Sequence, residues 1–260
     1  MNFFLTFAFL FSVGNSIGWI IELFYRRLVS AKRWLNPGFL VGPYLPLYGF
    51  GLCLLYLLAS LKFSFLPNDP LRVIFRILLI GISMTAIEYL AGKIFIVGMK
   101  VKLWDYSKKW GNIEGLICPE FSFYWTLLGG LYCFLIHPVF VRSVDNFLMH
   151  PFWYFTEGMY YGILLVDVFW SMRLLSRIRK FAKENHIVVR LEEFKKTVAD
   201  HAEKRRFWRF VFSLQDRSRS TADSLREYLN HLKQFTEERM QKISKGKQKA
   251  KKESEKEEKR

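Results

Sequence analysis

The strongest constraint on this chain is a series of long apolar runs in its first two thirds. A helix needs about 20 mostly apolar residues to cross the roughly 30 Å hydrocarbon core of a bilayer. Each crossing run has to be helical, because lipid offers the backbone no hydrogen-bond partners. The sequence therefore predicts an all-α, polytopic membrane helix bundle with about five transmembrane helices. The predicted spans are Asn2–Phe24, Tyr44–Leu61, Val73–Val97, Glu120–Val141 and Phe152–Met172.

The composition changes after Met172. Of the 39 Lys and Arg residues 26 follow it, but only 14 of the 23 Asp and Glu residues do, so this part carries +12 of the net charge of +16. We interpret 1–172 as the transmembrane bundle and 173–243 as a cytoplasmic, basic, amphipathic helical region. Residues 244–260 have too little apolar content to form a core, which predicts a disordered charged tail.

The loop charges predict how the bundle is oriented. Basic residues cluster in the first loop, in the third loop and at the start of the tail, and the other connections hold fewer. Because cytoplasmic loops carry an excess of Lys and Arg, we expect the N-terminus outside and the C-terminus inside. The protein is thus predicted to be a multi-pass protein of the cell membrane with a cytoplasmic C-terminus.

The tail contains helical spacings of apolar residues, beginning with Leu191, Phe194 and Val198, among many cations. This pattern is typical of a basic helix on the anionic inner leaflet. Packing on a partner protein is the alternative. No nucleic-acid partner is expected, because the leaflet is nearer and sufficient to bind the basic end.

Two GxxxG spacings occur within predicted spans, at Gly14–Gly18 and at Gly158–Gly162. Small residues at this spacing let two membrane helices approach closely. Either pair can serve packing within the bundle or a homodimer.

The segment Asn36–Gly51 contains three prolines and four glycines and is predicted to be irregular where it begins. Irregular backbone at membrane depth requires a protein cover or a wet cavity. The segment either packs inside the bundle or forms a plain loop at the interface. Asn36 and Tyr48 are secondary candidates for a site.

Glu88 lies well inside the third predicted span. An acid at mid-membrane costs about 2.5–3.5 kcal/mol on insertion scales, and such residues face the bundle interior. We interpret Glu88 in one of two ways: it has a functional role, or it forms an ion pair, for example with Lys93.

The stretch 103–125, "LWDYSKKWGNIEGLICPEFSFYW", separates two apolar runs on the predicted cytoplasmic side. Pro119 suits the first turn of the next helix, and an acid beside it suits the helix dipole. We predict a polar vestibule that binds a cation or a polar headgroup; an interfacial loop with an aromatic belt is the alternative. The main candidate residues are Glu22, Glu88, Asp105, Tyr106, Asn112 and Trp125, with Glu120 as a secondary one.

The last predicted span holds two more secondary candidates, Glu157 and Asp167. Ten residues apart, they lie about 80° from a common line on a helix and form no tight pair. Asp167 is expected to face Glu22 or to pair with Arg173. No metal centre is expected.

Four blocks in order, "GWIIELFY", "NPGFLVGPYLPLYGFG", "TAIEYLAGK" and "LWDYSKKWGNIEGLICPEFSFYWTLLGG", resemble the CmpB-like ABC-transporter type IV membrane protein family over Ser12–His137. The resemblance implies a permease subunit. Pro37 and Leu45 depart from the family pattern. The family positions that match are Glu22, Asn36, Gly38, Gly42, Pro43, Pro46, Tyr48, Gly49, Glu88, Asp105, Tyr106, Asn112, Gly115, Cys118 and Trp125.

The sequence contains no G-x-x-x-x-G-K-[ST] phosphate loop, so a permease role requires a separate ATP-binding subunit as partner. We expect no cofactor in this chain, and ATP only through that partner. Two alternatives remain open. One is an intramembrane enzyme or binding protein for a lipid or isoprenoid headgroup, in which the cluster of Glu22, Glu88, Asp105 and Asn112 binds a metal or serves as acid and base. The other is a membrane scaffold that presents the basic tail.

Overall fold

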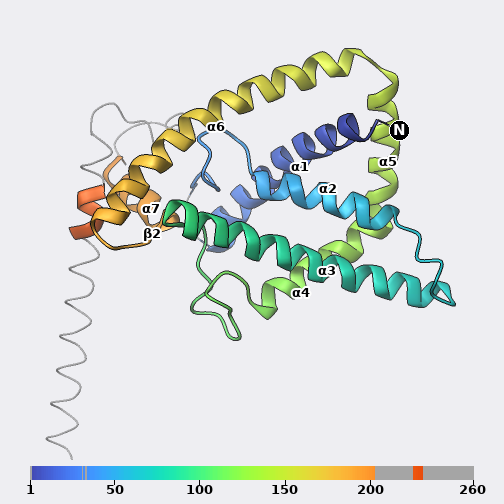
Figure 1. The fold of residues 1–260 in the computed structure, drawn as a ribbon, viewed down its shortest axis with the longest axis horizontal. Helices are drawn as coiled ribbons and strands as arrows, with labels where there is room; N and C mark the ends of the chain where they lie inside the picture. The colour runs from blue at the N-terminus through green and yellow to red at the C-terminus, as the bar shows by residue number, and fades with distance from the viewer. Residues whose placement is uncertain (1, 31, 33, 203–224, 231–260) are drawn as a thin grey trace, which may run out of the picture.

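The computed structural model describes residues 2–30, 32, 34–202 and 225–230, and these are mainly helical (Figure 1). Five-residue π-helical segments extend α1 (η1, Arg26–Ser30) and α3 (η2, Phe95–Met99) and join α4 to α5 (η3, Tyr132–Ile136). Two short strands, β1 (Val101–Lys102) and β2 (Val189–Arg190), pair in parallel. The helices are α1 (Phe3–Tyr25), α2 (Pro46–Ser60), α3 (Asp69–Ile94), α4 (Pro119–Leu131), α5 (His137–Met149), α6 (Phe152–Glu184) and α7 (Leu191–Ala202).

Four helical stretches in the described residues are long and apolar enough to cross a membrane: Phe3–Val29, Asp69–Met99, Pro119–Met149 and Phe152–Glu184. The apolar helix found within the predicted span Tyr44–Leu61 is shorter than the prediction. The helix there, α2, has 15 residues and begins only at Pro46. At 1.5 Å per residue it is about 22 Å long, which is shorter than the hydrocarbon core.

Helix α2 packs closely on α1. A Cβ added at Gly18 would overlap the Cβ of Tyr48, and one at Gly14 would lie 2.7 Å from the Cβ of Leu52. The first GxxxG pair therefore serves packing within the bundle. A Cβ added at Gly158 or Gly162 on α6 would meet no heavy atom within 4 Å, so this pair lies on an open face.

The irregular segment that precedes α2 is held inside the protein. The Asn36 side chain donates to the carbonyl oxygens of Leu40 (3.1 Å) and Val41 (2.7 Å). The Asp167 carboxylate on α6 accepts from the backbone N–H groups of Val41 (3.1 Å) and Gly42 (2.9 Å). Leu40 is fully buried. These side chains satisfy backbone groups that lipid would leave unpaired, so the interior interpretation is correct for this segment.

Helix α4 begins at Pro119, as the sequence predicts. The helical stretch continues past Val141, where the fourth predicted span ended. After η3 the chain turns, and α5 runs across the ends of α1 and α2 (Figure 1). Val144 packs there with Leu10 and Tyr56, so α5 covers that end of the bundle.

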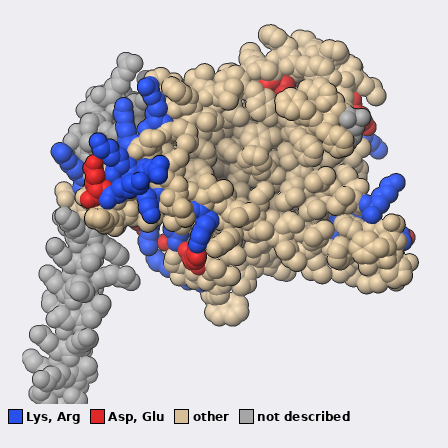
Figure 2. Space-filling view, in the orientation of Figure 1, with Lys and Arg blue, Asp and Glu red and all other residues tan. Residues whose placement is uncertain are grey.

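At the opposite end, α6 continues to Glu184, well past the predicted domain boundary after Met172. Leu175 and Ile178 of α6 form one buried cluster with Leu191 and Phe194 of α7. The helical turn 225–230 joins the same cluster. The apolar start of α7 thus packs on its own chain. The rest of the predicted amphipathic region, 203–224 and 231–243, and the charged tail 244–260 lie outside the described residues. Lys and Arg side chains gather at this end of the molecule (Figure 2).

Candidate polar site at one end of the bundle

The Glu88 carboxylate lies at the centre of a polar site between α3 and α4. The residue is only 3% exposed. Its Oε1 accepts a hydrogen bond from the Tyr106 hydroxyl and its Oε2 accepts one from the Trp125 indole N–H, each at 3.0 Å. Both donors are neutral, and no cation pairs with Glu88 within the described residues.

The predicted pairing of Glu88 with Lys93 is wrong. Lys93 pairs instead with Glu114 of the following loop, at 2.6 Å. Five residues on a helix turn the side chain by about 140°, so Lys93 leaves the face that Glu88 occupies.

The two donors are held in place by local packing. The Tyr106 ring stacks on Phe121 with centroids 4.4 Å apart, and the Tyr106 backbone N–H donates to the Gly115 carbonyl at 2.9 Å. Burial beside the Glu88 carboxylate raises the pKa of Tyr106 far above its usual value, so this hydroxyl remains a donor. Trp125 is one to two turns into α4, which packs closely on α3 because Gly129 faces Ile80.

Glu22 of α1 adjoins the same site. Its Oε2 accepts from the Tyr48 hydroxyl at 3.1 Å, and its Oε1 pairs with the Nε of Arg26 at 3.1 Å. The Tyr48 ring meets the Trp125 ring edge to face at 5.8 Å between centroids. Glu22 and Glu88 are therefore linked through two aromatic side chains, but only Glu22 is neutralised by a cation.

This arrangement has a clear chemical consequence. A buried carboxylate without a cationic partner is a strong acceptor, and it can bind a proton, a metal cation or an N–H donor of a solute. Within the described residues no group of three His, Cys, Asp or Glu side chains could hold a metal ion. The hydrogen bonds to Glu88 come from two neutral donors, Tyr106 and Trp125.

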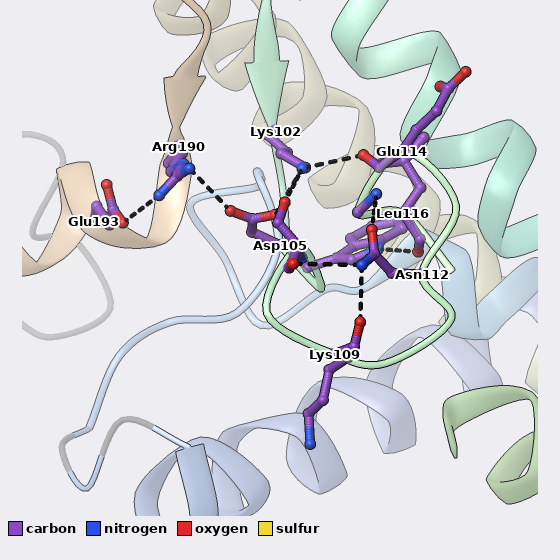
Figure 3. Close-up of polar contacts among 11 residues, drawn as sticks. Lys102, Asp105, Lys109, Asn112, Glu114, Leu116, Arg190 and Glu193 are labelled. Carbon is purple, nitrogen blue, oxygen red and sulfur yellow. Dashed lines mark hydrogen bonds and ion pairs between the residues drawn. The ribbon is translucent and has the colours of Figure 1, made fainter. Parts of the chain in front are cut away.

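Asp105 and Asn112 belong to a separate polar cluster in the α3–α4 loop (Figure 3). Asp105 pairs with Lys102 at 2.7 Å and with Arg190 of β2 at 3.3 Å. Burial opposes ionisation of Asp105, but hydrogen bonds from Lys102 and Ser107 outweigh it and lower its pKa.

Asn112 shapes the same loop. Its Nδ2 donates to the Lys109 carbonyl at 2.8 Å, and its Oδ1 accepts from the Gly115 N–H at 3.0 Å. These bonds fold the loop, and the ion pairs of Asp105 join it to β2. The loop's contribution to the Glu88 site is Tyr106.

The secondary candidates do not gather at one site. Glu120 pairs with Lys109 at 2.8 Å in a half-exposed position. Asn36 accepts from the Trp19 indole N–H at 2.6 Å and lies in the irregular segment. Asp167 binds that segment and Ser171 rather than Arg173, whose guanidinium lies over the rings of Phe169 and Trp170. Tyr48 is in the site, and Glu157 of α6 lies beside Ser12 of α1.

Sequence reasoning missed Lys195. This side chain is buried, and its Nζ donates to the carbonyl oxygens of Asn36 (2.8 Å) and Gly38 (2.7 Å). Burial and the nearby positive charge of Arg26 lower the pKa of Lys195 to about 7. The available signal was its position at i+4 from Leu191, on the apolar face of the predicted helix.

Arg26 connects the Glu88 site to α7. It pairs with Glu22, which adjoins the site, and its guanidinium lies 3.6 Å from the Glu192 carboxylate of α7. The irregular segment, α7 and the Glu22 side chain thus contact one another around Arg26 and Lys195. The helix that follows the bundle is part of the structure around the site.

A family model matches residues 9–172, which is more than half of the chain. No curated protein and no solved structure matches it. Together with the apolar helices, the family match indicates a multi-pass membrane protein associated with transport. The resemblance carried by the four sequence blocks is thereby confirmed, and the chain belongs to the family described as "Putative ABC-transporter type IV".

Proposed function

We propose that this protein is a permease-like subunit of an ABC transporter that works with a separate ATP-binding subunit. Family membership supports a transport system of this class. The lack of a phosphate-loop motif in the sequence supports a division of labour in which another chain hydrolyses ATP.

The observation that carries the proposal is the environment of Glu88. Removing an acid from water is costly unless it is paired or protonated. Glu88 is buried in a helix long enough to cross a membrane, and its two hydrogen-bond donors are neutral. Polar groups inside membrane segments mark the paths of solutes and ions. Glu88, with Glu22 beside it, is the group that binds the polar part of the transported solute.

The charge distribution supports an orientation. The end of the bundle that carries Lys and Arg is the cytoplasmic one, by the positive-inside rule (Figure 2). The N-terminus then lies outside and α7 lies inside. The same cations contact the anionic lipids of the inner leaflet.

The open glycine pair on α6 supports a homodimer. Gly158 and Gly162 have no neighbour within 4 Å of an added Cβ, and the surrounding side chains Phe155, Met159 and Ile163 are exposed. A second copy of this helix is the partner that such a face fits best.

The headgroup enzyme is the weaker alternative. It requires Asp105 beside Glu88 as the second acid or base. Asp105 pairs with Lys102 and Arg190 instead, and its lowered pKa makes it a poor base. A scaffold role does not explain why an acid is kept buried at Glu88 despite the cost of its burial.

Co-purification tests the proposal directly. The tagged protein is extracted from native membranes in mild detergent, and bound proteins are identified by mass spectrometry. A stoichiometric ATP-binding subunit is expected. Its repeated absence from intact, monodisperse protein would rule out a stable ABC assembly. Truncation after Ala202 serves as a control that separates binding by the bundle from binding by the tail.

A further inference from the structure

A second polar site lies between α1 and α6. Ser12, Asn15 and Ser16 lie on the face of α1 that also carries Glu22, because spacings of three, four and seven residues fall on one side of a helix. Asn15 is seven residues from Glu22, which is about 10 Å along the axis. This site is therefore further from the basic end of the molecule than Glu22 is.

The Tyr160 hydroxyl of α6 organises this site. It accepts from Asn15 Nδ2 at 2.9 Å and from Ser16 Oγ at 3.3 Å, and it donates to the Ser12 carbonyl at 3.2 Å. Glu157, one turn before Tyr160, interacts with both the Tyr160 and the Ser12 side chains. Asn15 and Glu157 thus have Tyr160 as a common neighbour.

Two acceptor atoms in this site have no hydrogen-bond partner. Asn15 is fully buried, and its Oδ1 is unpaired within the described residues. The Oε1 atom of Glu157 is also inaccessible and unpaired there. An unsatisfied buried polar group costs about 1–3 kcal/mol, and native proteins contain few of them. Two unpaired acceptors beside the same tyrosine, one of them a carboxylate, indicate a ligand that brings donors or positive charge.

We propose that Asn15 and Glu157 form a binding site for a small monovalent cation, either a metal ion such as Na⁺ or a primary ammonium group. The donors of the site are already used: the Tyr160 and Ser16 hydroxyls and Asn15 Nδ2 bond to one another or to the Ser12 carbonyl, and the Ser12 hydroxyl donates to the Phe9 carbonyl at 2.9 Å. Carboxylate, amide and hydroxyl oxygens suit a hard cation. An ammonium group has three N–H donors and can satisfy both unpaired oxygens at once.

If the protein transports a solute as proposed, this site indicates that the solute is positively charged. This inference about the solute rests on the proposed function. Asn15 and Glu22 lie on the same face of α1, and Glu88 of α3 adjoins Glu22. The binding of a cation is a separate property and does not depend on an ATP-binding partner.

Equilibrium binding tests the site. The full-length protein is purified into lipid nanodiscs, and scintillation proximity measures the binding of radiolabelled Na⁺ and, separately, of radiolabelled methylammonium. We expect saturable binding of one probe. Glu157→Gln should weaken it about tenfold or more, since hydrogen bonds to charged groups are worth at least this factor. Asp145→Asn, an exposed acid on α5, is the matched control and should leave the binding unchanged.

The outcomes distinguish a metal ion from an amine as the bound cation. Saturable Na⁺ binding that depends on Glu157 assigns the site to a metal ion, and methylammonium binding that depends on Glu157 assigns it to an amine. Glu157→Asp, which keeps the charge, guards against misfolding and should retain part of the affinity. Binding of neither probe, or binding that survives Glu157→Gln, would overturn the proposal. Absence of an ATP-binding subunit would refute the proposed function and leave this result standing.

Discussion

At the scale of single residues, the Glu88 carboxylate depends on donors from two other segments. Tyr106 comes from the α3–α4 loop and Trp125 from α4, and each donates to a different oxygen at 3.0 Å. The loss of one donor leaves a buried carboxylate oxygen without a partner. The energetic effect of Tyr106 therefore depends on whether Glu88 is present.

A double-mutant cycle measures this dependence. Tyr106→Phe should lower the free energy of unfolding by about 1–3 kcal/mol in the natural protein, because it strands a buried acceptor. In a Glu88→Met background the same change should cost little, and the coupling should exceed about 0.5 kcal/mol. SDS-induced unfolding of purified protein gives the values. Tyr124→Phe, at a half-exposed tyrosine of α4, is the control. Equal costs of Tyr106→Phe in both backgrounds would contradict the contact.

Lys195 gives the protein a pH-dependent stability. Its native pKa is about 7, and the unfolded value is about 10.4. Between these values the native side chain is neutral while the unfolded one is protonated. The unfolded state then binds more protons, so the free energy of unfolding should rise with pH from about 7 upward. Below pH 7 this contribution is flat.

Lys195→Met should remove this rise, which amounts to at most about 1.4 kcal/mol per pH unit. Thermal unfolding between pH 6 and pH 9 checks it, with Lys183→Met, an exposed lysine at the end of α6, as the control. A slope that persists in Lys195→Met would assign the effect to another group.

At the scale of elements, the α1–α2 pair is defined by how closely two backbones approach. Gly18 faces the Cβ and ring of Tyr48, which also donates to Glu22. Packing and site geometry therefore depend on the same contact. The short α2 is placed by this contact and by the irregular segment before it.

Gly18→Ala should destabilise the protein by about 1–3 kcal/mol or more, because the new methyl group overlaps the Tyr48 Cβ, which is fixed to its backbone. Gly162→Ala should be neutral or slightly stabilising in the monomer, since it meets open space and alanine favours helix. Unfolding midpoints of the two variants are compared in detergent. Similar midpoints would show that α1 and α2 do not pack this closely.

At the scale of the whole molecule, the outward faces are apolar and the basic residues gather at one end (Figure 2). The long α6 links these features, because it runs from the open glycine pair to the cluster that holds α7. Assembly through α6 would place two copies with their basic ends together.

The double variant Gly158→Leu/Gly162→Leu should lower the dimer fraction several-fold, because leucine side chains prevent the close approach of two α6 helices. Energy transfer between donor- and acceptor-labelled copies in liposomes, measured as lipid is added, gives the dimer fraction. Gly98→Leu is the control, since Gly98 is equally open but lies outside any GxxxG pair. An unchanged dimer fraction would exclude this face as the interface.

Much of the local structure could be predicted from sequence. Runs of apolar residues predicted α1, α3, α4 and α6, and Pro119 marked the start of α4 correctly. Burial of Glu88 could be predicted because an acid within a membrane-spanning helix faces the bundle interior rather than lipid. Helix α2 is shorter than the predicted span because it begins only at Pro46, whereas hydropathy alone counts the residues just before Pro46 as part of the apolar run.

By itself the sequence determined the long apolar helices α1, α3, α4 and α6, the burial of Glu88 and the basic end, since each follows from neighbouring residues and the cost of leaving water. Only the tertiary structure decided which polar groups meet. It brought Tyr106 to Glu88 but gave Asp105 to Lys102 and Arg190, and it placed Lys195 against Asn36, 159 residues away. Such contacts depend on how helices approach and how a loop folds, and no local pattern of residue types encodes those distances.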